Sequence, residues 1–161
     1  MEASTAVVTP TGFQPVAKAS VVAAGDAEAL PDLTKLAANA PSPTYKILAL
    51  RGWFRLVQQQ DAPADDRLAS LNAAMALVER NDERKLALAA LGSVPTVAAL
   101  AVVTPYLDDP ALKEEAGAAA VAIGEGMKKP LPPEIIAAVE KVAKLTTSDA
   151  TAKRAKALLG K

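Results

Sequence analysis

The sequence contains no cysteine, no histidine and few aromatic residues. The first two absences exclude disulfides, thiolate nucleophiles, imidazole bases and the commonest zinc ligands. Aromatic residues make up 3% of the chain although 51% of its 161 residues are apolar, so small aliphatic side chains must fill the core. Alanine is the best helix former, and an alanine-rich interior favours closely packed helices in one domain.

The chain also lacks long apolar runs. No run reaches the roughly 18 to 20 residues that a membrane-spanning helix needs. The first residues, MEASTAVVTPTG, show no basic region followed by an apolar one. We therefore expect neither a membrane span nor a signal peptide. The sequence names no compartment, and the cytoplasm is the default expectation.

Charge is balanced over the whole chain but unevenly distributed along it. Residues 61–115 hold ten acidic and five basic residues, whereas residues 126–161 hold eight basic and three acidic residues. One interpretation is that these charges belong to solvated helix faces. The other is a polarised surface that orients a partner.

Apolar residues recur at helical spacing along most of the chain, and no segment sustains the two-residue alternation of a half-buried strand. This pattern predicts an all-α fold with essentially no sheet. Residues 1–14 show no helical period and are expected to form a flexible lead. Helices are expected at residues 15–24, 27–38, 44–59, 64–80, 82–91, 95–107, 110–123, 134–145 and 150–159.

The turn at Asp109 and Pro110 organises this pattern. Asp109 is expected to accept hydrogen bonds from the first N–H groups of the next helix, and Pro110 suits the first helical position. One face of that helix is made almost wholly of alanine, so another helix can pack closely against it. The residues of this face are Leu112, Ala116, Ala119, Ala120 and Ile123.

Helix pairs separated by Asp and Pro turns suggest an internal repeat. An alanine follows about one turn after a polar start in four helices, at Ala49, Ala87, Ala116 and Ala155. These positions are 38, 29 and 39 residues apart, which indicates a period of about 40 residues with a shortened middle unit.

The segment from Leu100 to Gly124, LAVVTPYLDDPALKEEAGAAAVAIG, resembles a HEAT repeat. It has a proline before the final leucine of its first helix, Asp at the turn, a basic residue and a second helix with spaced alanines. Residues 25–33 are similar to the junction between HEAT units, which makes residues 15–24 the second helix of a preceding unit. The resemblance covers residues 15–161 and extends to HEAT segments of large bacterial multidomain proteins. It implies an α-solenoid of about four helical hairpins, whose stacked neighbours share one core.

Four residues of the helix expected at 44–59 are candidates for contact with a protein partner: Arg51, Trp53, Arg55 and Gln58. Arg51, Arg55 and Gln58 lie opposite the apolar stripe and are expected to be exposed. Trp53 is the single tryptophan, and two interpretations stay open for it. It is either a core or inter-repeat contact, or a binding hot spot, since Trp and Arg contribute strongly at interfaces.

No motif for chemistry stands out. The carboxylate pairs Asp65–Asp66, Asp108–Asp109 and Glu114–Glu115 all fall at expected helix starts, where negative charge is stabilised by roughly 0.3 to 1 kcal/mol. We therefore expect them to cap helices. Gly124-Glu125-Gly126 is a lone GxG, expected to be a loop, without the strand and helix that phosphate binding needs. We expect no catalytic residue, cofactor, metal or small-molecule substrate.

The leading hypothesis is a non-catalytic protein-binding or scaffolding module. The alternatives are a nucleic-acid-binding HEAT-like protein and an accessory region of a bacterial multidomain enzyme. The neutral net charge argues against nucleic acid, because a binding face for nucleic acid normally carries a basic stripe.

Overall fold

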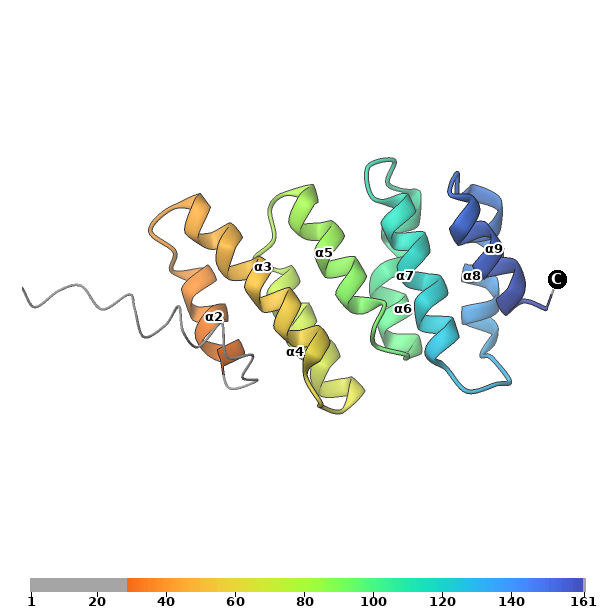
Figure 1. The fold of residues 1–161 in the computed structure, drawn as a ribbon, viewed down its shortest axis with the longest axis horizontal. Helices are drawn as coiled ribbons and strands as arrows, with labels where there is room; N and C mark the ends of the chain where they lie inside the picture. Colours follow the sequence, from red (N-terminus) through yellow and green to blue (C-terminus); the bar gives the residue numbers. More distant parts are fainter. Residues whose placement is uncertain (1–28, 161) are drawn as a thin grey trace, which may run out of the picture.

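The computed structural model describes residues 29–160, and this part of the chain is all-helical without strands. The all-α prediction is thereby confirmed for these residues. The flexible lead expected at 1–14 and the helix expected at 15–24 lie outside them. The elements, shown in Figure 1, are α2 (Ala29–Ala38), α3 (Pro43–Gln59), α4 (Ala64–Met75), α5 (Asn81–Leu91), α6 (Val97–Val103), the 3-10 helix η1 (Thr104–Asp108), α7 (Lys113–Gly126), α8 (Pro133–Leu145) and α9 (Asp149–Leu158).

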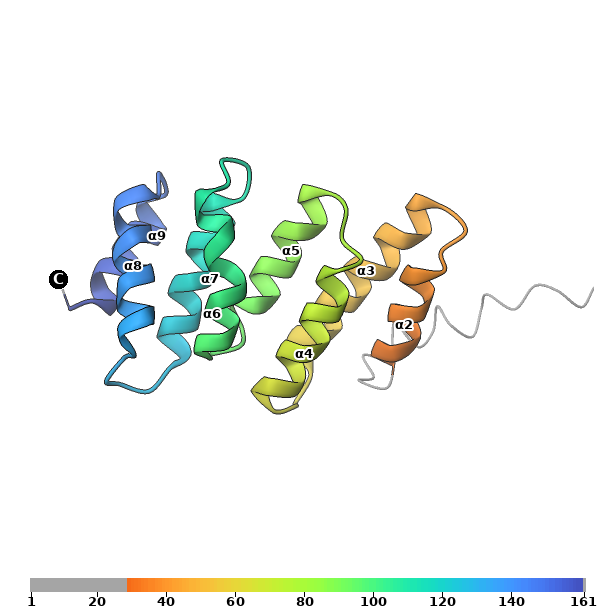
Figure 2. The ribbon, with the colours of Figure 1, turned by 180° about the vertical axis from the view of Figure 1, so that it is seen from behind.

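The helices follow one another along the longest axis of the molecule. A front layer, seen in Figure 1, contains α3, α5, α7 and α9, and each of these helices contacts the next one in that order. A back layer, seen in Figure 2, contains α4, α6 and α8, while α2 packs against α3 at the N-terminal end. Most contacts therefore join elements that are close in sequence.

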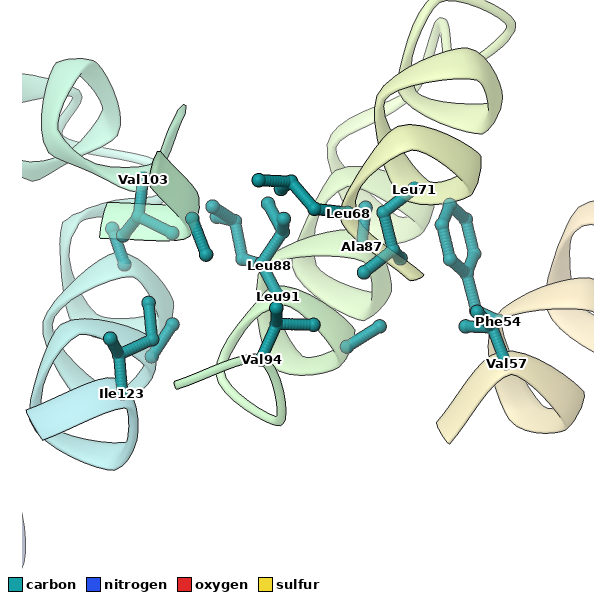
Figure 3. Packing of buried hydrophobic residues seen from close by; sticks show 14 of the residues in the cluster. Phe54, Val57, Leu68, Leu71, Ala87, Leu88, Leu91, Val94, Val103 and Ile123 are labelled. Carbon is teal, nitrogen blue, oxygen red and sulfur yellow. The ribbon is translucent and has the colours of Figure 1, made fainter. Parts of the chain in front are cut away.

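One apolar cluster extends through this arrangement from Leu30 to Ala155. Figure 3 shows its centre, where Phe54 of α3 lies beside Leu71 of α4 and Leu88 of α5 lies between the neighbouring helices. The alanine face expected in α7 is confirmed, because all five of its residues are buried. They are Leu112, Ala116, Ala119, Ala120 and Ile123.

The helix starts follow the sequence signals with one correction. α3 begins at Pro43, one residue before the expected start at 44, and the side chain of Ser42 makes no capping hydrogen bond. Asp109 does not cap α7. Its Oδ1 accepts a hydrogen bond from the backbone N–H of Ala111 at 2.8 Å, and α7 begins only at Lys113. The aspartate therefore closes a tight turn before the helix, and Pro110 lies in that turn.

Three other expected boundaries are wrong. The helix expected at 64–80 ends at Met75, and the chain turns before α5. The helix expected at 95–107 becomes α6 followed by η1, because Pro105 has no N–H to continue the α-helical ladder. Residues 124–126, expected to form a loop, are the last residues of α7.

The four front-layer helices share a register. Their first residues are 38, 32 and 36 residues apart, and the residue six positions after each start is a buried alanine. These alanines are Ala49, Ala87, Ala119 and Ala155. Ala119 thus replaces Ala116 in the expected repeat, because the turn at 109–112 delays the start of α7 by almost one helical turn.

Candidate interaction surface

The candidate surface on α3 contains three of its four expected residues. Arg51, Arg55 and Gln58 are exposed, as their positions opposite the apolar stripe predicted. The helix presents them on successive turns because they are separated by four and three residues. The expected exposure of these three polar side chains is thereby confirmed.

Trp53 does not belong to this surface. Its exposed fraction is 2%, and its ring meets the ring of Phe54 edge to face, with centroids 5.3 Å apart and planes at 87°. The structure thus supports the core interpretation of Trp53. Its indole Nε1 is buried without a hydrogen-bond partner, so packing and not a polar contact holds the ring in place.

Arg51 has a structural contact that the sequence analysis missed. Its Nε and one terminal nitrogen each lie 3.2 Å from Oε1 of Glu83, the third residue of α5. The Glu83 side chain is only 2% exposed, whereas half of the Arg51 side chain reaches solvent. A buried carboxylate requires such a partner. Arg51 therefore fixes α5 against α3, and its guanidinium is only partly available to a partner.

Further ion pairs, more exposed than this one, also join parts of the chain that are far apart in sequence. Lys46 of α3 pairs with Glu79 before α5, and Arg154 of α9 pairs with Glu125 of α7. Two more are Lys85–Glu115 at 3.2 Å and Lys141–Asp108 at 2.7 Å. The partners are separated by 29 to 33 residues, about the spacing of the helix starts. Acidic and basic residues that are 29 to 33 positions apart were therefore the sequence signal from which these ion pairs could have been predicted.

The Glu114 carboxylate is held by three hydrogen bonds from the connection between α8 and α9. It accepts hydrogen bonds from the Thr146 hydroxyl at 2.6 Å, the Thr147 backbone N–H at 2.9 Å and the Thr147 hydroxyl at 3.0 Å. These donors, the Thr146 hydroxyl first, lower the pKa of Glu114 to about 2. Hydrogen bonding to Lys46 similarly lowers the pKa of Glu79, and to Arg154 that of Glu125.

The acidic pairs thus act within the helical framework. Asp65 and Asp66 lie in the first turn of α4, and Glu114 and Glu115 lie in the first turn of α7, as expected. The third pair does not lie at a helix start, because Asp108 ends η1 and Asp109 lies in the turn after it. Within residues 29–160, no group of three or more acidic residues is placed to hold a metal ion. No helix of this part is long and apolar enough to cross a membrane.

A hollow of about 530 Å³ lies away from the candidate surface, between α6, η1 and α8. Its lining is mainly aliphatic, with Glu134 and Lys141 among the residues around it. Lys141 is paired with Asp108. None of the four candidate residues on α3 lines this hollow.

Comparison of the chain with protein-family models, with curated proteins and with solved structures gave no significant match.

Proposed function

We propose that the helices form a short α-solenoid of HEAT type, and that the chain is a non-catalytic module that binds a protein partner. The shared register of the four front-layer helices is the observation that carries this proposal. A buried alanine recurs at the same position of α3, α5, α7 and α9, and each of these helices contacts the next. Nearest-neighbour stacking of equivalent units is the architecture of solenoids, which offer extended surfaces to partners.

The partner-binding surface of this proposal is the exposed side of α3. Arg55 and Gln58 are exposed, and their side chains form no ion pair and no hydrogen bond within residues 29–160. Arg51 contributes the exposed part of its side chain. Arginine binds carboxylates through charge-assisted hydrogen bonds, so the matching partner is a protein segment that carries acidic side chains.

Nucleic-acid binding has less support. Two of the bases that would have to form a basic stripe on α3, Lys46 and Arg51, are held by Glu79 and Glu83. Each pair cancels the positive charge that phosphate binding needs. The third possibility, an accessory region of a larger bacterial enzyme, has no observation of its own in its favour.

Affinity capture from cell extract with the immobilised full chain tests the proposal. The test variant is Arg55→Glu/Gln58→Glu, which replaces a positive and a neutral side chain by carboxylates and leaves the Arg51–Glu83 pair unchanged. We expect a captured protein to be lost with this variant, because carboxylates on both sides repel each other. Binding of the purified captured protein is then measured by calorimetry for the wild type and the variant.

Lys153→Glu/Lys156→Glu on α9 is the matched control, because it also places two carboxylates three residues apart at exposed positions of a front-layer helix. This control should retain the captured protein, and all three chains should melt at the same temperature by circular dichroism. Equal capture by the wild type and the α3 variant would show that this side of α3 is not the binding surface.

A further inference from the structure

The N-terminal end of the front layer exposes two large apolar side chains. Tyr45 and Leu48 of α3 are 57% and 59% exposed, more than any other large apolar residue that the structure describes. Both belong to a helix whose other apolar residues form the core with α2, α4 and α5. This face of α3 therefore lacks a partner among residues 29–160.

The register of the front layer tells which way this face points. The third residue of α5, Glu83, contacts Arg51 of the preceding helix α3, and the third residue of α7, Glu115, contacts Lys85 of the preceding helix α5. The third residue of α9, Thr151, lies against the position of Gly117 in α7. In each case the third residue faces the preceding front-layer helix.

Tyr45 is the third residue of α3, so it faces the place of a front-layer helix before α3. At the equivalent positions Glu83 and Thr151 are buried and the Glu115 side chain is 35% exposed, because a preceding helix covers each of them wholly or in part. The exposure of Tyr45 thus marks one missing neighbour at a defined position. Leu48 is the sixth residue of α3, and the sixth residues of α5 and α9, Leu86 and Arg154, are exposed as well, so Tyr45 alone carries this step.

The chain immediately before α2 has the length and composition for this neighbour. Residues 15–24, PVAKASVVAA, are small and apolar apart from Lys18 and Ser20, and Gly25 follows them. Residues 25–28 lie between this segment and Ala29, the first residue of α2 that the structure describes. The connections from a front-layer helix to the next back-layer helix elsewhere contain four, five and six residues, at 60–63, 92–96 and 127–132.

We propose that residues 15–24 dock as a helix on the Tyr45 and Leu48 face of α3 and close the N-terminal end of the molecule. This inference deepens the proposed function, because it rests on the solenoid register. Gly92 follows α5 and lies against Ala119 and Ala122 of α7. If Gly25 lies against α3 as Gly92 lies against α7, its neighbours are Ala49 and Gly52, which hold the positions of Ala119 and Ala122. The same alignment of residues 15–24 with α5 places Val22 and Lys18 opposite Tyr45.

Engineered disulfides test this placement directly, because the chain has no native cysteine. Tyr45→Cys is combined in turn with a single cysteine at each position from Val16 to Ala24, and the full chain is oxidised at micromolar concentration. A disulfide requires Cα atoms about 4.4 to 6.8 Å apart. A short connection gives an effective concentration in the millimolar range, so the correct pairs should close within one chain.

We expect intramolecular crosslinking to be strongest for Val22→Cys and Lys18→Cys, with weaker closure at the positions between them. The matched control pairs Val22→Cys with Gln58→Cys, which lies on the same helix α3 but on its opposite side and near its other end. Crosslinking that is uniform along residues 16–24, or as frequent with the control, would overturn the docking. Crosslinks only between chains would replace it by association of two copies.

A second variant avoids cysteines. Val22→Asp should lower the melting temperature of the full chain, whereas Val8→Asp, the same change in residues 1–14, should leave it unchanged. Equal melting of both variants would contradict the docking. These readouts require no partner, so the docking can fail while capture through Arg55 and Gln58 succeeds, or the reverse.

Discussion

The contact between α3 and α5 and the contact between α5 and α7 are neighbours in one layer, but they use different chemistry. At the first contact, the large ring of Phe54 packs near Leu71 and Ala87 (Figure 3). Glu83 is also buried there, paired with Arg51. At the second, a Cβ added to Gly92 would lie 3.2 Å from the Ala119 Cα and 3.4 Å from the Ala122 Cβ.

The difference shows how side-chain size decides what becomes buried between helices. Small residues let α5 and α7 approach until backbone atoms nearly touch. Their ion pair, Lys85–Glu115, stays at the surface, with both side chains at least one-third exposed. The α3–α5 contact contains larger side chains, and it also buries the Glu83 carboxylate, whose charge Arg51 must compensate. We expect the first contact to fail by loss of charge compensation and the second by overpacking.

The largest effect is expected from Arg51→Glu. Breaking a buried ion pair by removing one partner costs about 3 to 5 kcal/mol, and the half-exposed Arg51 side chain places this pair near 3 kcal/mol. The new carboxylate would also lie beside buried Glu83. Urea denaturation monitored by circular dichroism measures the change in the free energy of unfolding.

Arg55→Glu is the matched control for this change, since Arg55 is exposed on the same helix. Its effect on the midpoint should be small. If Arg51→Glu were as mild as the control, Glu83 would not depend on Arg51, and the contrast between the two contacts would fail. The result also decides how Arg51 variants in a binding assay are interpreted.

Ala116→Leu should have the next largest effect, roughly 1 to 3 kcal/mol of destabilisation from overpacking. Ala116 is fully buried in α7, one helical turn before Ala119, which lies against Gly92 at the end of α5. Denaturation midpoints measure this cost, and Ala73→Leu on the exposed side of α4 is the control. An unchanged midpoint for Ala116→Leu would mean that this contact tolerates larger residues.

Ala116 and Arg55 also show what the sequence could predict, and Arg51 and Trp53 show what it could not. The burial of Ala116 and the exposure of Arg55 follow from helical periodicity within one segment, and both were predicted correctly. The Arg51–Glu83 pair and the burial of Trp53 depend on which helix lies opposite, and periodicity within one helix does not determine this. The start of α7 was misplaced for a local reason, because a turn closed by Asp109 has the same residues as a helix cap.

The contact between α7 and the connection before α9 gives a third, smaller test. Glu114 accepts three hydrogen bonds from Thr146 and Thr147, and they hold its pKa at about 2, below the ordinary value of 4.5. A carboxylate with a lowered folded-state pKa contributes stability that is present above pH 4.5 and is lost as the pH falls toward 2. We therefore expect wild type and Glu114→Gln to differ in urea midpoint at pH 7, and this difference to shrink progressively as the pH falls from 4.5 toward 2.

Glu115→Gln is the control at the adjacent position, since Glu115 faces Lys85 across the exposed pair. Exposed ion pairs contribute about 0 to 1 kcal/mol, so this variant should stay close to wild type throughout the pH range. A Glu114→Gln difference that stayed as large at pH 2 as at pH 7 would show that the amide disrupts packing and that charge is not the cause. Convergence would show instead that α7 carries two neighbouring carboxylates with separate tasks, one binding the threonines before α9 and one facing α5 at the surface.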